Sequence, residues 1–183
     1  MNTNTNVNTL DADKPRCFGG KVVFYHPKRS GKGSAARFEL RLNRPGEDGY
    51  DCFFLEMASQ KKGSPSSRNA SFDWENKITV KLDFMDVSEI LTVLDGKATA
   101  VGGERKALYH QTNGSSTLIG LAAREDGNGY FLGLSKKSTD GHYQKRISLS
   151  LSQVEATGLS RVLGMGLFHM SFQSSINATS CRR

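Results

Sequence analysis

Hydrophobic and polar residues alternate along four stretches in the first half of the chain, and a matching series follows in the second half. Alternation with a period of two is typical of a strand that buries one face and leaves the other to solvent. Phe38, Leu40 and Leu42, for example, alternate with arginine and glutamate. The pattern predicts strands at residues 21–26, 36–42, 53–57, 78–82, 105–110, 114–121, 130–134 and 147–151.

An apolar stripe with helical spacing follows the fourth strand of each half, because residues three and four positions apart share one face of a helix. The stripes consist of Val87, Ile90, Leu91 and Leu94, and of Val154, Leu159, Val162 and Leu163. We predict Asp86 as the N-cap of the first helix, with Glu89 three residues on, and Gly96 just past its end, where positive φ is needed. Ser152 and Glu155 have the spacing of a capping box at the start of the second helix.

The two halves carry the same order of elements, and Tyr25-His26 of the first strand returns as Tyr109-His110. A repeat of this kind does not bury its apolar face alone, so both halves should share one core. We therefore predict an α+β fold of two ββββα repeats, in which two antiparallel sheets pack together with the helices.

Residues 19–172 are predicted to form a single domain, with repeats at 20–97 and 104–172. Residues 1–18 are rich in Asn and Thr and lack periodicity, which predicts a disordered arm. Residues 173–183 are predicted to form a flexible basic tail.

The second helix ends in a segment, residues 164–170, whose apolar residues occur all round instead of on one stripe. A surface of that kind is typically covered, and a second copy of the chain is the simplest cover. Gly158, Gly164 and Gly166 would let helices approach closely. We predict a homotetramer, with a dimer as the alternative.

The formal net charge of +7 indicates an acidic partner such as nucleic acid. Cys17, Cys52 and Cys181 lack paired spacing, which favours a reducing compartment, and Cys52 is predicted to be a small buried hydrophobe. No apolar run reaches the roughly 18 residues that span a bilayer, and the N-terminus lacks a leader pattern. We expect a cytoplasmic or nucleoid-associated protein that does not bind membranes.

The sequence contains no recognised catalytic signature. Its histidines lack the spacing of metal ligands, and the recurrence of His26 and His110 is explained by the duplication. Residues 30–34 resemble the end of a phosphate loop, but they lack the upstream glycine and a Ser or Thr directly after Lys32. We interpret them as a hairpin loop that contacts a nucleic-acid backbone, and we expect no enzymatic activity, no metal and no cofactor.

The third strand of each repeat is predicted to point one phenylalanine away from the core. Because neighbouring side chains alternate, Phe54 points outward when Phe53 and Leu55 point inward, and Phe131 does the same in the second repeat. Outward rings beside basic strand residues suit bases that stack while phosphates meet the cations. The alternatives are that the strand faces the other way, or that the rings fill a subunit interface or the core.

An insertion at residues 60–71, rich in Lys, Ser, Gly and Pro, is predicted to be a mobile loop in the first repeat only. A pair of lysines follows the third strand of both repeats, Lys61-Lys62 in the first and Lys136-Lys137 in the second. A solvated charge pair is the ordinary interpretation of either, and the recurrence favours contacts with phosphates.

Residues 72–91 resemble the Whirly family of single-stranded-DNA-binding proteins. An aromatic-Asp-Trp, then Lys77, an alternating strand and an amphipathic helix follow one another there, and the mitochondrial RNA-binding proteins of kinetoplastids are similar. Residues 32–36 are similar to the family's Lys-Gly-Lys-Ala-Ala, with Ser34 in place of the second Lys, and residues 126–132 resemble the entry to the third strand of its second repeat. The resemblance covers about residues 20–170.

The resemblance implies two packed sheets with helices, a homotetramer assembled through those helices, and sequence-tolerant binding of single-stranded DNA along sheet edges. We expect a bacterial, plasmid or phage protein that protects or presents single strands in replication, repair, recombination or DNA transfer. RNA binding or annealing on the same fold, transcriptional regulation, and a scaffold role without nucleic acid remain alternatives.

The predicted contacts divide into rings that stack on bases and cations that neutralise phosphates. The rings are Tyr25, Phe54, Tyr109 and Phe131, and the cations are Lys32, Arg37, Arg41, Lys61, Lys77, Lys81, Lys136 and Lys137. Trp74 is predicted to be a structural anchor beneath its strand, because so large a ring usually lies mostly buried.

Overall fold

A computed structural model describes residues 20–43, 50–62 and 69–180, and for residues 173–180 only the backbone. The predicted arm at residues 1–18 and the middle of the 60–71 insertion lie outside the described residues. The elements in chain order are β1 (Lys21–His26), β2 (Ser34–Arg41), β3 (Cys52–Ser59), β4 (Ile78–Leu82), α1 (Phe84–Leu94), the 3-10 turn η1 (Gly103–Arg105), β5 (Leu108–Thr112), β6 (Ser115–Ala123), β7 (Tyr130–Ser138), β8 (Gln144–Leu151) and α2 (Gln153–Ser180).

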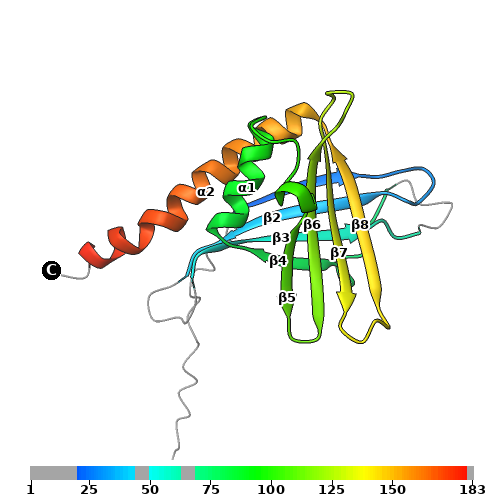
Figure 1. Cartoon of the computed structure of the whole chain (residues 1–183), viewed down its shortest axis with the longest axis horizontal. Coiled ribbons are helices and arrows are strands. Elements are labelled where there is room, and N and C mark those ends of the chain that lie inside the picture. The colour runs from blue at the N-terminus through cyan, green and yellow to red at the C-terminus, as the bar shows by residue number, and fades with distance from the viewer. Residues whose placement is uncertain (1–19, 44–49, 63–68, 181–183) are drawn as a thin grey trace, which may run out of the picture.

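Strands β1–β4 form one antiparallel sheet in chain order, here called sheet 1, and β5–β8 form sheet 2 in the same way. Short connections place consecutive antiparallel strands side by side, so each sheet is a simple meander. Figure 1 shows the two sheets crossing each other, with α1 after the first and α2 after the second. This arrangement confirms the predicted pair of ββββα repeats.

The inner faces of the two sheets and one face of each helix share a single core. Phe53 and Leu55 of sheet 1 belong to the same buried cluster as Leu121 and Leu132 of sheet 2 and Ile90 of α1. Each fully buried side chain of this size contributes about 1.5–3 kcal/mol to folding. The shared cluster explains why neither repeat is expected to be stable alone.

Polar contacts also join the repeats. The Ser34 hydroxyl donates a hydrogen bond to the Ser148 carbonyl oxygen at 2.6 Å, which connects β2 to β8. The ammonium group of Lys145 on β8 donates to the carbonyl oxygen of Asn76, just before β4. Ser34 is the residue that stands in place of the second lysine of the resembled motif, and here it serves the contact between the sheets.

Each helix begins in a capping box that is held by a histidine of the other repeat. Asp83 is the N-cap of α1, and its box partner is Asp86, whose Oδ1 lies 3.0 Å from His110 Nε2. In α2, Glu155 accepts hydrogen bonds from the backbone N–H and the hydroxyl of Ser152, and its Oε1 lies 2.8 Å from His26 Nε2. The recurrence of the two histidines therefore has a structural role.

Several boundaries differ from the predictions, and three of them change a helix or the start of the second repeat. Asp86 is not the N-cap of α1, because the helix begins earlier and Asp86 takes the third position of the capping box. The fifth strand begins at Leu108 and not at residue 105, because η1 and the left-handed backbone of Lys106 precede it. Helix α2 continues to Ser180, whereas we predicted a flexible tail from residue 173.

The glycines of α2 do not share one role. An added Cβ at Gly158 or Gly164 would meet no heavy atom within 4 Å, whereas at Gly166 it would overlap the ring of Phe53. Gly166 therefore lets α2 lie directly on sheet 1 within the same chain. At Gly166 the close approach is to a strand residue of the same chain, and the approach between helices of different copies stays a prediction.

The two ends of the insertion in the first repeat are joined. Gln60 forms an isolated antiparallel bridge with Phe72, and the backbone N–H of Lys61 donates to the Ser71 carbonyl oxygen at 2.8 Å. The Gln60 side-chain oxygen also accepts from the backbone N–H of Gly33 at 3.0 Å. These bonds bring the β1–β2 turn, the end of β3 and the segment that follows residue 69 to one place.

Candidate functional site

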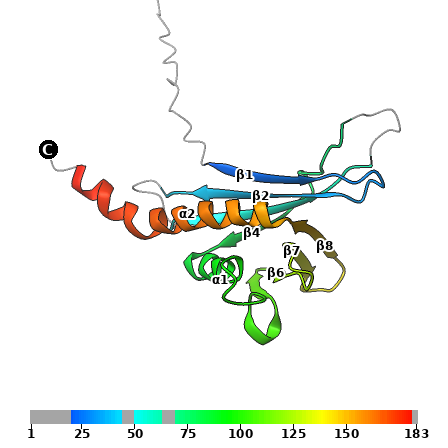
Figure 2. The same ribbon diagram turned by 90° about the horizontal axis from the view of Figure 1, so that it is seen from above.

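The outer face of sheet 1 carries the rings and cations that the sequence pattern placed there. Phe53 and Leu55 are buried in the core and Phe54 between them is half-buried, so the predicted orientation of β3 is correct. Lys81 lies directly across from Phe54 on β4, and Glu39 lies across from it on β2. In Figure 2, sheet 2 and α1 lie on one side of sheet 1, and no described helix or strand covers the other side.

Three aromatic rings gather at one end of this outer face. The Tyr25 ring lies 5.4 Å from that of Phe72 and 6.5 Å from that of Trp74, edge to face in the second case. The guanidinium of Arg37 stacks on Trp74, 4.8 Å from the ring centroid. Tyr25 is 57% exposed, while Phe72 and Trp74 are half-buried.

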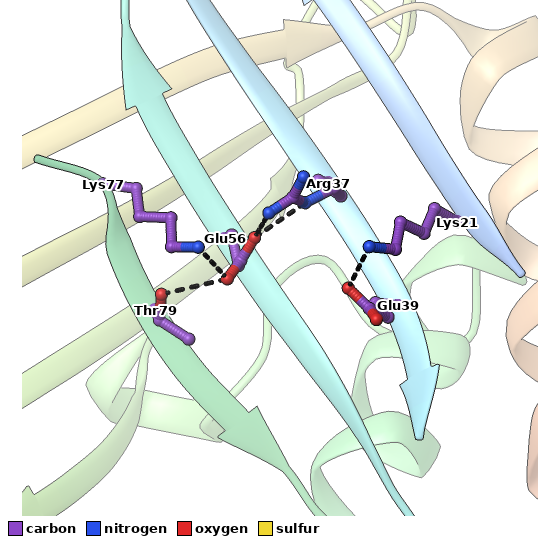
Figure 3. A network of polar contacts seen from close by, with 6 residues as sticks. All are labelled: Lys21, Arg37, Glu39, Glu56, Lys77 and Thr79. Atoms are coloured by element: carbon purple, nitrogen blue, oxygen red, sulfur yellow. Dashed lines mark hydrogen bonds and ion pairs between the residues drawn. The ribbon is translucent and has the colours of Figure 1, made fainter. Parts of the chain in front are cut away.

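A buried carboxylate occupies the middle of the outer face (Figure 3). Glu56 is only 7% exposed, and its Oε2 accepts hydrogen bonds from Nε of Arg37 at 2.7 Å and from Nη2 of the same side chain. Its Oε1 accepts from Lys77 Nζ at 2.7 Å and from the Thr79 hydroxyl at 3.3 Å. Arg37 and Lys77, both predicted to meet phosphates, are thus already paired within the protein.

The charge state of Glu56 follows from these contacts. Burial raises the pKa of the carboxyl, but hydrogen bonds from Lys77 and Arg37, together with their positive charges, outweigh it and lower the pKa below its usual value. Glu56 is therefore ionised at neutral pH. The sequence pattern did not identify this residue, although a glutamate at an outward strand position between basic neighbours is a signal for such a pair.

A second group of rings and cations lies at the other end of the outer face. The ammonium group of Lys81 lies 3.5 Å from the ring centroid of Tyr50, which is exposed, and Arg41 is exposed at the end of β2. Lys21 forms an ion pair with Glu39 at 3.1 Å, also seen in Figure 3. Cys52 beneath them is buried, and burial raises its thiol pKa, as expected of a small hydrophobe.

Sheet 2 repeats the exposed rings on its own outer face. Tyr109 is 54% exposed and Phe131 53%, at the positions that correspond to Tyr25 and Phe54. The guanidinium of Arg124 lies 5.1 Å from the Phe131 ring centroid and donates a hydrogen bond to the Asp126 carboxylate. This hydrogen bond lowers the pKa of Asp126 to about 2. Neither Arg124 nor Tyr50 was predicted as a site residue.

The remaining predicted cations lie at different places. Lys32 in the β1–β2 turn and Lys61 after β3 are exposed, and Lys137 is exposed on the outer side of β7. Lys136 points to the opposite side and lies directly across from Lys145 of β8. Because strand neighbours alternate, Lys136 and Lys137 do not act on one face.

The predicted site residues therefore divide between two surfaces. The inner faces of the sheets pack on each other, so the outer faces point in different directions and do not merge within one chain. Sheet 1 carries Tyr25, Arg37, Arg41, Phe54, Lys77 and Lys81, and sheet 2 carries Tyr109, Phe131 and Lys137. Within residues 20–43, 50–62 and 69–180, no cluster of three or more potential metal ligands occurs, and no helix is long and apolar enough to cross a membrane.

Comparison with known proteins gives matches in structure only. No family model and no curated protein matches the sequence. WHY1 from Arabidopsis thaliana superposes with a TM-score of 0.65 at 15% identity, covering 93% of this chain and 97% of that one. The plant transcriptional regulator PBF-2 superposes with a TM-score of 0.64 at 15% sequence identity, and the match covers 88% of this chain and 87% of that one. A chain of a guide-RNA-binding protein complex bound to a guide RNA superposes with a TM-score of 0.53 at 16% sequence identity, and the match covers 84% of this chain and 92% of that one. The chain has the Whirly fold, as the sequence motifs predicted.

Proposed function

We propose that this chain, which has the Whirly fold, binds single-stranded nucleic acid, with DNA as the first choice and little sequence preference. The observation that carries the proposal is the repetition of outward rings on the outer faces of both sheets, exposed at Tyr25, Tyr109 and Phe131 and half-buried at Phe54. Lys81 lies across from Phe54, and Arg124 lies over Phe131. An unpaired base of any identity can stack on such a ring. The bases of a duplex are already stacked on one another and are not available to the ring. We propose a role in protecting or presenting single strands in replication, repair, recombination or DNA transfer, without catalysis.

The phosphates would meet exposed cations that form no ion pair within residues 20–43, 50–62 and 69–180. Lys32, Lys61 and Lys137 are exposed at the margins of the two outer faces, and so is Arg41. Each phosphate neutralised on a single strand contributes about 0.7 to the slope of log affinity against log salt. Contacts by these four side chains predict a slope of about −3.

The test is a titration of fluorescein-labelled oligo(dT) and of a labelled duplex of equal length, at salt concentrations from about 50 to about 200 mM. We expect tighter binding of the single strand at every salt concentration, with affinity that falls as salt rises. Equal affinity for the duplex, or affinity that does not depend on salt, would contradict the proposal. Preference for the duplex would favour the transcriptional regulator.

RNA binding is the second candidate, supported by the likeness to the guide-RNA-binding complex. Stacking rings and exposed cations accept RNA as well as DNA, because neither kind of contact depends on the 2′-hydroxyl. Competition between DNA and RNA oligonucleotides of equal sequence separates the candidates. A tenfold or greater preference for RNA would replace the first choice by the second.

We also propose a homotetramer, with a dimer as the alternative. Met165, Phe168 and Phe172 lie exposed on α2 with a spacing that puts them on one face of the helix, an apolar surface that a second copy would bury. Phe168 is the better position for a test, because the neighbouring Leu167 packs against the chain's own core. F168D should shift the mass in light scattering toward the 20.1 kDa protomer. V154D, at an exposed position near the start of α2, is the control. A wild-type monomer at micromolar concentration would refute the proposal.

A further inference from the structure

We propose that Trp74, with Tyr25 and Phe72, is a stacking platform for an unpaired base, and that Glu56 positions this platform through Arg37. The inference rests on the proposed function, because it names a binding site for one base on the outer face of sheet 1. It assigns Trp74 to the ligand, whereas the sequence pattern predicted a structural anchor. It also assigns Arg37 to the support of that ring, whereas the sequence pattern predicted a phosphate contact.

The backbone that carries Trp74 is fixed to the end of β3. The Asp73 N–H donates to the Ser59 carbonyl oxygen at 2.8 Å, and the Gln60–Phe72 bridge lies beside that bond. The Asp73 carboxylate accepts from the side-chain amide of Asn76 at 3.0 Å, which closes the turn into β4. The ring is thus presented from a constrained segment, and a base that stacks on it would not have to order the segment first.

The ring itself is held by a chain of contacts that begins in the sheet. Glu56 binds the guanidinium of Arg37 through two of its nitrogens, which fixes the orientation of the guanidinium plane. That plane lies against the Trp74 ring, and the Tyr25 ring meets Trp74 edge to face. A cation over an aromatic ring is attracted to the negative face of the ring, so this contact restrains both side chains. Loss of Glu56 would free Arg37 and, through it, Trp74.

Arg37 is poorly placed to serve a phosphate. Its charge is compensated by a carboxylate that is nearly inaccessible to solvent, and a phosphate would have to compete with a two-nitrogen hydrogen-bonded pair. Lys61, by contrast, is exposed on the segment that closes against Ser71, next to the rings. A strand whose base lies on Trp74 or Tyr25 would therefore find its phosphate partner at the margin of the platform and not at its centre.

Trp74 is the only tryptophan of the chain, so intrinsic fluorescence reports this site alone. Unlabelled oligo(dT) should quench or shift the emission of the wild-type protein in proportion to binding, and should protect it from acrylamide. W74L should weaken binding by about five- to 100-fold, the range observed when a stacking ring is removed. The slope of affinity against salt should not change, because no phosphate contact is lost.

Glu56 has a matched control on the same face. E56Q and E39Q each remove one negative charge from the outer face of sheet 1, but Glu39 pairs with Lys21, whereas Glu56 binds the arginine that lies over Trp74. We expect E56Q to bind oligo(dT) at least about threefold more weakly than E39Q, with a smaller fluorescence change. Thermal unfolding and circular dichroism check that each variant folds. If W74L does not fold, the fluorescence of the wild-type protein and the comparison of E56Q with E39Q still test whether Trp74 is a stacking platform.

The outcomes separate the two proposals. Salt-dependent binding of single strands without any change in Trp74 emission, or with W74L unchanged in affinity, overturns the inference and leaves the proposed function standing. Tighter binding by E56Q with a slope steeper by about 0.7–1.4 also overturns it, because Arg37 and Lys77 would then be phosphate ligands that Glu56 masks. Absence of a preference for single strands in the wild type overturns both.

Discussion

Replacement of Gly166 by alanine tests how closely α2 lies on sheet 1. The new Cβ would fall well under 3.0 Å from Cζ and Cε2 of Phe53, where ordinary carbon contacts are about 3.5–4.0 Å. Phe53 is 1% exposed and lies inside the shared core, so its ring has no open space to enter. Either the ring leaves its rotamer or the helix moves outward by roughly 1.5–2 Å, the shortfall from ordinary contact.

The magnitude follows from two opposing terms. Overpacking of a closed core costs about 1–3 kcal/mol, and alanine in place of glycine within a helix contributes about 1 kcal/mol of stability. G166A should therefore be destabilised by a net ~0–2 kcal/mol relative to the wild type. The same replacement at Gly164, where an added Cβ meets no heavy atom within 4 Å, keeps the helical gain without the clash.

The informative quantity is the difference between the two variants. G166A should unfold about 1–3 kcal/mol more easily than G164A, which corresponds to roughly 2–12 °C in the thermal midpoint for a chain of this length. Urea and thermal unfolding followed by circular dichroism give both numbers, and G158A repeats the control at a second open position. Equal stability of G166A and G164A would refute the contact between α2 and Phe53.

Further predictions concern the helix cap, acid stability and the phosphate contacts. S152A removes a capping hydroxyl of α2 and should lower the free energy of unfolding by about 1 kcal/mol in urea; an unchanged midpoint would contradict the capping box. The folded pKa of Glu56 lies below its ordinary value of 4.5, so its stabilisation is complete above that value and is lost as pH falls through the folded pKa. E56Q should therefore flatten the loss of stability with acid below about pH 4.5, and an equally steep loss would argue against the pairing. K32Q and K137Q should each reduce the salt slope of single-strand binding by about 0.7, whereas K77Q should leave it unchanged; a loss of slope in K77Q alone would reverse the assignment.

Local sequence patterns were enough to predict the order of the elements and the orientation of most strand residues. Alternation with a period of two decides which side chains share a face, so Phe53 and Phe54 were assigned to opposite faces correctly. Ser152 and Glu155 were sufficient to locate the start of α2, because a capping box involves only neighbouring residues. Such signals involve residues only a few positions apart in sequence, so they do not depend on contacts with distant segments.

Which of the predicted cations are paired within the protein follows only from its three-dimensional contacts. Arg37, Glu56 and Lys77 lie on three different strands or their ends, and only the strand register brings them within hydrogen-bonding distance. The same register separates Lys136 from Lys137, and the packing of the inner faces separates the two outer surfaces. Composition records the number of charges but not their partners. Pairing depends on contacts between residues far apart in sequence, which no local pattern encodes.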